Sequence, residues 1–149
     1  MRRAPGLGDD RGSVLLLTLG LMVVAFLSVV VVVDASAAFL QRRQLAAWAD
    51  TAALAGAQGI DVDAYYSDGA SAATRLDAAT VTARVRQHLA VAPDDIAIER
   101  LSSDGSQVLL VLSTPLRLPF LGGLVPSGAI PESVVVESRA RLAYRPHYP

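Results

Sequence analysis

The feature that most constrains this chain is an unbroken apolar run near its N-terminus. No charged residue occurs between Ser13 and Val33, and the only polar side chains after Ser13 in this run are Thr18 and Ser28. As an α-helix the run rises about 30 Å, which matches the hydrocarbon thickness of a bilayer. In lipid every backbone polar group must bond within the chain, so the segment has to be helical there. Its length predicts a membrane-spanning helix over residues 13–33 rather than the core helix of a soluble protein.

Three fates are open for this segment. It can stay as an uncleaved anchor, or a prepilin-type leader ending in Gly12 can be removed while the helix stays on the mature chain. It can also be a secretory signal, because Ala35-Ser36-Ala37 has the small-x-small form that signal peptidase accepts. Signal peptides usually have apolar regions of about 7–15 residues. The length of the run therefore favours an anchor over a removed signal.

Arginine residues on both sides of the run indicate its orientation. Arg2, Arg3 and Arg11 precede it, and Arg42 and Arg43 follow it. Lys/Arg asymmetry sets the cytoplasmic side, so we expect a cytoplasmic N-terminus and an extracytoplasmic C-terminal domain. All 13 basic residues are arginine, and asparagine is missing too. Lysine and asparagine codons are AT-rich, so this composition indicates a GC-rich bacterial genome, and we expect a single-pass protein of a bacterial cell membrane.

Composition and motifs also exclude several classes of function. A net charge of -1 lacks the basic footprint of nucleic-acid binding. The chain has no cysteine, which excludes disulfides, thiolate metal sites and cysteine nucleophiles. The acidic loop Asp61–Asp68 lacks the ligand spacing and closing glutamate of a calcium loop, and neither His88 nor His147 forms part of a catalytic motif. We therefore expect no enzyme, with no catalytic residue, no metal and no cofactor.

The predicted helix continues beyond the apolar run. Residues 35–57 contain no proline and only one glycine near their end, and alanine dominates them, so the helix should extend into the aqueous phase. A stripe of one leucine and small residues falls at helical spacing on one face, and such a stripe lets helices approach closely. Its members are Leu45, Ala49, Ala52 and Gly56. The stripe packs on a helix of another protein or on the chain's own domain, and the two uses can coexist.

The remainder predicts a second helix and a small antiparallel sheet. The helix runs over residues 76–91, with Asp77 placed as a cap or a first-turn acid and Pro93 preventing continuation. Strands follow at residues 96–101 and 107–114, joined by a turn at 102–105, and the apolar run 108–112 suggests a second strand covered on both faces. Residues 115–131 hold four prolines and three glycines, so no regular central strand is expected there. A last strand over 133–144 alternates between apolar and charged side chains.

These elements predict an α+β fold with a pilin-like layout: a long N-terminal transmembrane helix that continues into the soluble phase, a second helix and a small antiparallel sheet. The predicted organisation has four parts. Residues 1–12 form a short cytoplasmic leader-like tail, 13–33 the transmembrane helix, 34–58 its helical continuation, and 59–149 a small α+β extracytoplasmic domain.

The N-terminal third resembles a known family. The motif Arg11-Gly12-Ser13, the apolar span and the stretch D-A-S-A-A-F-L-Q-R-R-Q-L-A-A-W-A-D-T-A-A-L-A-G-A over residues 34–57 are similar to TadE/TadG-like proteins of the Tad, or Flp pilus, system. In that family an R-G-small motif precedes the membrane helix, and a stretch of the form D-x-small followed by an arginine, a leucine and A-A-D-A-A-A-L-A-A-A comes after it. The resemblance covers residues 11–58.

The resemblance implies a single-pass, pseudopilin-like membrane protein that assists assembly of a Tad/Flp-type pilus or its secretion machinery. It also implies prepilin-style cleavage between Gly12 and Ser13. The implied partners are membrane lipid and other Tad-type pilus or secretion proteins, with the N-terminal helix packing on itself or on related pseudopilins. Leu17 stands where prepilins commonly carry a glutamate, which points to TadG-like or otherwise divergent members.

A second function is open on the residues alone. The chain can be a membrane-anchored extracytoplasmic binding or regulatory module with no role in a filament. In that case the proline- and glycine-rich segment 115–131 is its contact loop.

Overall fold

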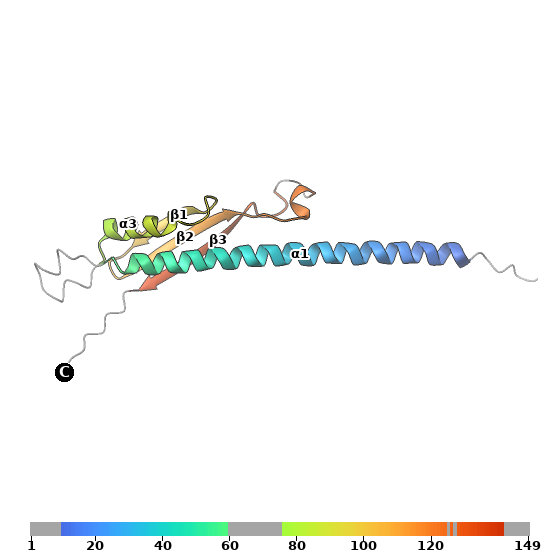
Figure 1. Cartoon of the computed structure of the whole chain (residues 1–149), viewed down its shortest axis with the longest axis horizontal. Coiled ribbons are helices and arrows are strands. Elements are labelled where there is room, and N and C mark those ends of the chain that lie inside the picture. The colour runs from blue at the N-terminus through green and yellow to red at the C-terminus, as the bar shows by residue number, and fades with distance from the viewer. Residues whose placement is uncertain (1–9, 60–75, 125, 127, 142–149) are drawn as a thin grey trace, which may run out of the picture.

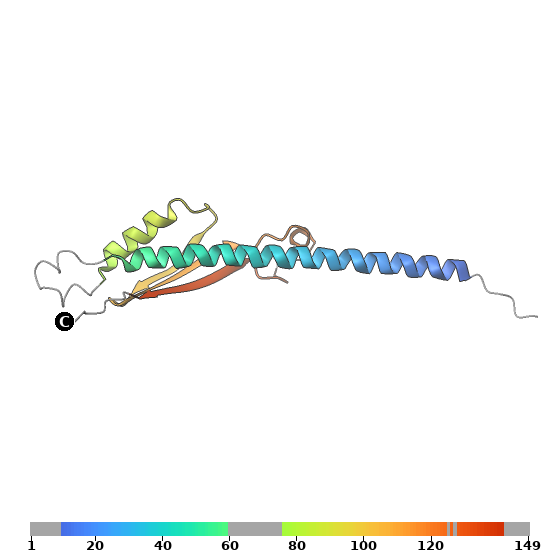
Figure 2. The same ribbon diagram turned by 60° about the horizontal axis from the view of Figure 1, so that its bottom comes forward.

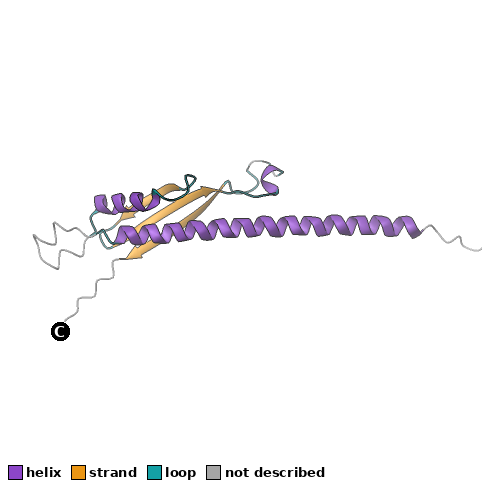
Figure 3. Ribbon diagram, in the orientation of Figure 1, coloured by secondary structure: helices purple, strands orange, loops and turns teal. Residues whose placement is uncertain are grey.

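The computed structural model describes residues 10–59, 76–124, 126 and 128–141 (Figure 1). The elements, in chain order, are α1 (Asp10–Ala57), α3 (Ala78–Leu89), β1 (Ala97–Ser103), β2 (Gln107–Pro115), the short 3-10 helix η1 (Leu121–Gly123) and β3 (Ser133–Arg141). The α+β fold is thereby confirmed (Figure 3). The predicted acidic loop at 61–68 and the end of the last predicted strand, 142–144, lie outside the described residues.

Helix α1 runs without interruption for 48 residues, about 72 Å at 1.5 Å per residue. It passes through Asp34, where the apolar run ends, as the sequence predicts. The two polar side chains within the apolar run bond back to their own helix: the Thr18 hydroxyl donates to the carbonyls of Val14 and Leu15, and the Ser28 hydroxyl donates to that of Val24. Because the hydroxyls donate to carbonyls of their own helix, they need neither water nor another side chain as a partner.

The sheet has three antiparallel strands in the order β1-β2-β3. The β1–β2 hairpin closes at the pair Ser103–Val108, and its turn contains Gly105 with φ +84°, a left-handed conformation that favours glycine. Strands β2 and β3 stay in register from Gln107–Arg141 to Pro115–Ser133. The predicted turn begins two residues later than expected, because Ser102 and Ser103 belong to β1.

Both helices cover one face of the sheet, with α1 over β2 and β3 and α3 beside it over β1 (Figure 2). The fully buried residues of β2, Val108, Leu110 and Leu112, point into this core. Leu109 and Val111 on the opposite face are only half-buried. The prediction of a strand covered on both faces is wrong, because no described element lies over the outer face.

Helix α3 is held at both ends. Asp77 caps its N-terminus: one carboxylate oxygen accepts the Thr80 backbone N–H at 2.8 Å and the Thr80 hydroxyl at 2.7 Å. These hydrogen bonds, the hydroxyl's first, lower the pKa of Asp77 below its usual 3.8. At the other end, His88 meets α1, where its Nε2 lies 3.1 Å from the Thr51 hydroxyl and its ring packs edge-on against Trp48. The predicted cap is confirmed, and the helix ends at Leu89, two residues earlier than predicted.

Asp104 organises the β1–β2 turn. Its carboxylate accepts the backbone N–H groups of Ser106 and Gln107 at 2.9 and 2.8 Å, and also the Ser106 hydroxyl and the Gln107 side-chain amide. These hydrogen bonds hold the pKa of Asp104 well below its usual 3.8, and the bond from the Gln107 side-chain amide has the largest effect. The ionised form is thus the one that the folded turn binds.

The turn predicts a pH-dependent loss of stability. The folded-state pKa of Asp104 is depressed, so its stabilising effect is present above about pH 4 and is lost as the pH falls toward that lower value. Asp104→Asn should lower the free energy of unfolding at pH 7, and the deficit should shrink below pH 4, measured by urea unfolding of the full chain in detergent. Asp94→Asn, in the exposed turn before β1, is the control and should change little. A deficit that stays constant down to pH 3 would contradict a role for the charge.

The core predicts that α1 tolerates no larger side chain on its buried face. Ala49 is fully buried and Ala47, two residues earlier on the same helix, is exposed. Ala49→Leu should destabilise the fold by about 1–3 kcal/mol through overpacking, whereas Ala47→Leu introduces the same side chain where there is room. Urea unfolding followed by Trp48 fluorescence measures both. Equal stability of the two variants would show that the helix does not pack as closely as described.

Candidate functional site on the N-terminal helix

The first half of α1 has no partner within the described chain. Every residue from Gly12 to Val29 is exposed, including large apolar side chains such as Leu17 and Met22, each 72% exposed. Among the described residues this is the one helix that is long and apolar enough to cross a membrane. A solvent-exposed apolar surface of this length is far larger than soluble monomers carry.

The second half of α1 buries one continuous stripe, hereafter the α1 stripe. Residues three, four or seven positions apart lie on the same side of an α-helix. The stripe consists of Val30, Asp34, Gln41, Leu45, Ala49, Ala52 and Gly56, all buried except the half-buried Gln41. It combines the predicted small-residue face with three further positions toward the N-terminus.

Asp34 joins the stripe to the connection between β2 and β3. Its carboxylate oxygens accept the backbone N–H groups of Phe120 and Leu121, at 3.0 and 2.7 Å. The residue is only 2% exposed. A buried carboxylate is tolerated only when it is hydrogen-bonded, and hydrogen bonds to an ionised acceptor are the stronger kind. Asp34 therefore tethers the loop to the helix at the point where the apolar run ends.

Gln41 repeats this arrangement two turns further along α1. Its side-chain carbonyl accepts the Arg117 backbone N–H at 3.0 Å, and its amide donates to the Arg117 carbonyl. The guanidinium of Arg117 meets Asp95 at 3.1 Å, but both side chains are partly exposed, so this ion pair adds little stability. The paired bonds of Gln41 are the stronger constraint on this end of the loop.

Asp50 provides a third polar contact, beside the stripe. It accepts the hydroxyl of Ser138, a buried residue of β3, at 2.7 Å. Three polar side chains of α1 thus each bind a different part of the C-terminal half of the chain. Together they fix the position of the sheet and its loop along the helix.

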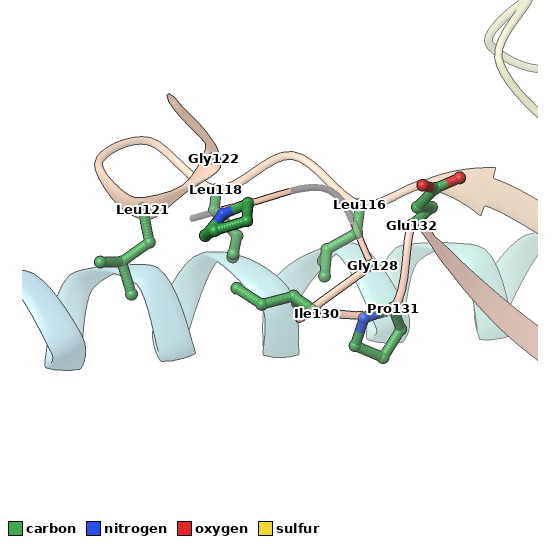
Figure 4. Close-up of a pocket in the computed structure, with 9 residues that line it drawn as sticks. Leu116, Leu118, Leu121, Gly122, Gly128, Ile130, Pro131 and Glu132 are labelled. Atoms are coloured by element: carbon green, nitrogen blue, oxygen red, sulfur yellow. The ribbon is translucent and has the colours of Figure 1, made fainter. Parts of the chain in front are cut away.

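The loop between β2 and β3, residues 116–132, extends in its described part (without residues 125 and 127) along α1 toward the N-terminus (Figures 1 and 2). It is closed at its base by the Leu116 N–H, which donates to the Glu132 carbonyl at 3.0 Å. Figure 4 shows Leu116, Leu118 and Leu121 pointing from the loop toward α1. They line a shallow hollow of about 230 Å³ whose one charged lining residue is Glu132, and a single carboxylate in an open hollow offers no acid–base pair or nucleophile.

The predicted site residues lie in two separate places. Gly12 and Ser13 are exposed in the first turn of α1, and processing between them stays a prediction. Leu45, Ala49, Ala52 and Gly56 lie in the chain's own core, where a Cβ added at Gly56 would come within 2.9 Å of Val85 Cγ2. The use of this face against a helix of another protein stays a prediction. The described part of the chain holds no group of three acidic or histidine side chains able to bind a metal.

Sequence reasoning missed the role of two residues in the stripe. In the sequence Asp34 marks only the end of the apolar run, and Gln41 stands directly before two arginines. Gln41 lies four residues and Asp34 eleven residues before Leu45, about one and three full helical turns, so both share its face. A polar residue on the buried face of an otherwise apolar stripe was the available signal for a tether.

The second half of α1 lies in the core and the first half does not, and both halves fall within one recognisable segment. Residues 12–59 match the family described as putative Flp pilus-assembly TadE/G-like proteins. The chain carries a TadE/G-like segment. This segment coincides with α1, beginning and ending two residues after the helix does. The resemblance seen in the sequence motifs is confirmed over these residues, and the family is described by a role in pilus assembly rather than by a reaction. No curated protein and no solved structure matches the chain significantly.

The Asp34 tether makes a specific prediction. Asp34→Ala removes the acceptor of two backbone N–H groups, and each buried donor left unpaired costs about 1–3 kcal/mol. Amide hydrogen exchange of Phe120 and Leu121 should accelerate strongly in this variant and less in Asp34→Asn, which keeps one acceptor oxygen. Asp50→Ala is the matched control, since it removes a contact to β3 and should leave these two amides protected. Unchanged exchange in Asp34→Ala would refute the tether.

Proposed function

We propose that this chain is a single-pass, pseudopilin-like membrane component that assists assembly of a Tad/Flp-type pilus or its secretion machinery. The observation that carries the proposal is the coincidence of the TadE/G-like segment with a helix of two unlike halves. One half is exposed and apolar, and the other forms the core of a small α+β domain. A helix of this kind presents a folded domain while its free half serves membrane insertion or assembly.

Membrane insertion is supported by the surface of residues 12–29. Outside a membrane this surface would face water, at a free-energy cost that grows with its apolar area. Inside a bilayer the same side chains contact lipid, and the helix satisfies its own backbone and hydroxyl groups. Arg2, Arg3 and Arg11 on one side and Arg42 and Arg43 on the other favour a cytoplasmic N-terminus. The domain then lies outside the cytoplasm.

The proposed partners are other Tad-type proteins, including copies of this chain or related pseudopilins. The small-residue part of the stripe packs on the chain's own α3 and sheet, so we place the lateral packing on the exposed half of α1. Helices associate in membranes through close van der Waals contact, and small residues favour it. Gly20, with no heavy atom within 4 Å of an added Cβ, is such a position on the free half.

The assembly role is tested by deleting the gene and complementing it. Pilus number on the cell surface should fall in the deletion strain and recover with the full chain, and a Tad secretion ATPase or platform protein should co-purify after crosslinking. Gly20→Leu keeps the span apolar, so the protein should still insert into the membrane while pilus number falls. Normal piliation in the deletion strain, with an unrelated envelope protein co-purifying, would instead support the anchored binding module.

Processing is tested separately, by mass spectrometry of the protein extracted from membranes. A mature chain beginning at Ser13 is the expected result, because the Arg-Gly-Ser motif then acts as a prepilin-type cleavage site. Gly12→Leu should block this cleavage, with Gly8→Leu as the control in the preceding tail. A chain beginning near Ala38 would contradict the membrane role, because the whole exposed half of α1 would then have been removed.

A further inference from the structure

We propose that the loop of residues 116–132 is a second membrane contact, which inserts its tip into the interface of the bilayer that holds α1. The inference rests on the proposed membrane role of α1 and adds a lipid-binding surface to it. The tip is defined here as Leu118, Phe120, Leu121 and Leu124. The tip is proposed to contact lipid at the boundary between headgroups and acyl chains, beside the last turn of the apolar run.

The first step is position. Of the described parts of the domain, the loop reaches furthest along α1 toward its N-terminus (Figure 1). It is tied to Asp34, the first residue after the apolar run, by two hydrogen bonds. Val30, one turn further into the apolar run, is only 7% exposed, whereas residues 12–29 are all exposed. The tip therefore overlaps the end of the run by about 6 Å, one helical turn.

The second step is composition. Arg117 and Glu132 stand at the two ends of the loop, and no charged residue occurs between them. The loop is also rich in leucine and proline, unlike the polar connections of soluble domains. A stretch without charge, flanked by charges at its base, matches the polarity gradient from water into a bilayer. Lipid-facing segments at this depth bury apolar side chains about 5–10 Å into the headgroup–acyl boundary.

The third step is exposure. Leu124 is 77% exposed and Phe120 is 48% exposed, although Leu116, Leu118 and Leu121 of the same loop turn toward α1 (Figure 4). The loop thus has an inner apolar surface that packs on the helix and an outer apolar surface that nothing described covers. The hydrogen bonds to Asp34 hold this outer surface beside the end of the apolar run.

The fourth step is the backbone. In a bilayer an unpaired N–H group costs several kcal/mol. At the tip the N–H groups of Phe120 and Leu121 are taken by the Asp34 carboxylate, and that of Leu124 donates to the Leu121 carbonyl at 3.1 Å. Pro119 and Pro126 have no N–H to satisfy. The tip therefore presents side chains outward with these donors already paired inward.

Lipid is favoured over a partner's transmembrane helix as the occupant. Contacts between helices in membranes depend on small side chains that let backbones approach. The outer surface of the tip instead offers Phe120 and Leu124 on a protruding loop, and such side chains suit a fluid surface. A protein occupant is a distinguishable outcome of the following test.

The test uses the fact that the chain contains no cysteine. Single cysteines are introduced into the full chain by Leu124→Cys, Val91→Cys and Met22→Cys, labelled with an environment-sensitive fluorophore and reconstituted into phosphatidylcholine vesicles. Val91 is the matched control for Leu124: both are aliphatic loop residues, 78% and 77% exposed, but Val91 lines a hollow with Ala55 and Gln58, and Ala55 lies about 30 Å along α1 from Asp34. Met22 reports on insertion of α1 itself.

The label at Leu124 should emit at shorter wavelength and be quenched by a lipid carrying a quencher near the headgroup, while the label at Val91 should not respond. If the Met22 label is quenched by a deep-placed quencher and the Leu124 label stays in water, this inference is overturned and the membrane role of α1 stands. If neither is quenched, the membrane role itself fails. Protection of Leu124 only after adding other Tad-type proteins would identify a protein occupant and overturn the lipid contact.

Discussion

The close approach of α1 to the rest of the domain is the constraint on which the remaining structure depends. Ala49, Ala52 and Gly56 carry one side-chain carbon or none, so the helix lies directly against the inner faces of α3 and β2. With no cysteine available for disulfides, a domain this small needs a well-packed apolar core. The second half of α1 provides one side of that core, and the position of α3, the sheet and the β2–β3 loop all follow from it.

An alanine-rich stripe packs closely but distinguishes poorly between registers, since one small residue resembles the next. Three polar residues supply the missing specificity. Asp34, Gln41 and Asp50 each meet one defined group, on the loop tip, at the loop base and on β3 respectively. A shift of one helical turn would leave these groups unpaired, and Asp34 would then be a buried charge without partners. The apolar stripe holds the sheet against α1, and the polar contacts determine where along α1 it sits.

The sequence predicted those elements whose cause is local. The apolar run and the alanine-rich stretch after it contain no helix breaker and gave the continuous helix, and Asp77 and the Asp104–Gly105 turn act through neighbours within three residues. Contacts that join distant segments were not predictable, because nothing near Asp34 in the chain indicates that residues 120 and 121 will meet it. The same limit explains the wrong prediction that β2 is covered on both faces. Its apolar run 108–112 indicates that both sides of the strand are apolar, but it does not indicate how many layers cover them.

The predicted site shows this limit at a finer scale. Spacing alone placed Leu45, Ala49, Ala52 and Gly56 on one face, and that face is indeed buried. Spacing does not say which surface buries it, and the chain's own α3 and sheet do so. The half of α1 that looked like a simple anchor is therefore the half left free for contacts beyond the chain.

The uninterrupted course of α1 has a mechanical consequence. Between Gly20 and Gly56 the helix contains neither glycine nor proline, so it has no hinge at the proposed membrane surface. In the proposed membrane arrangement the domain is therefore carried on a stiff helix, whose angle to the membrane is set by the segment within the bilayer. A tilt of about 20°, the average for transmembrane helices, swings the far end of α1 sideways by about 12 Å relative to Asp34. In that arrangement, any neighbour that changes the tilt of residues 13–33 also changes the orientation of the sheet relative to the membrane, with no rearrangement inside the domain.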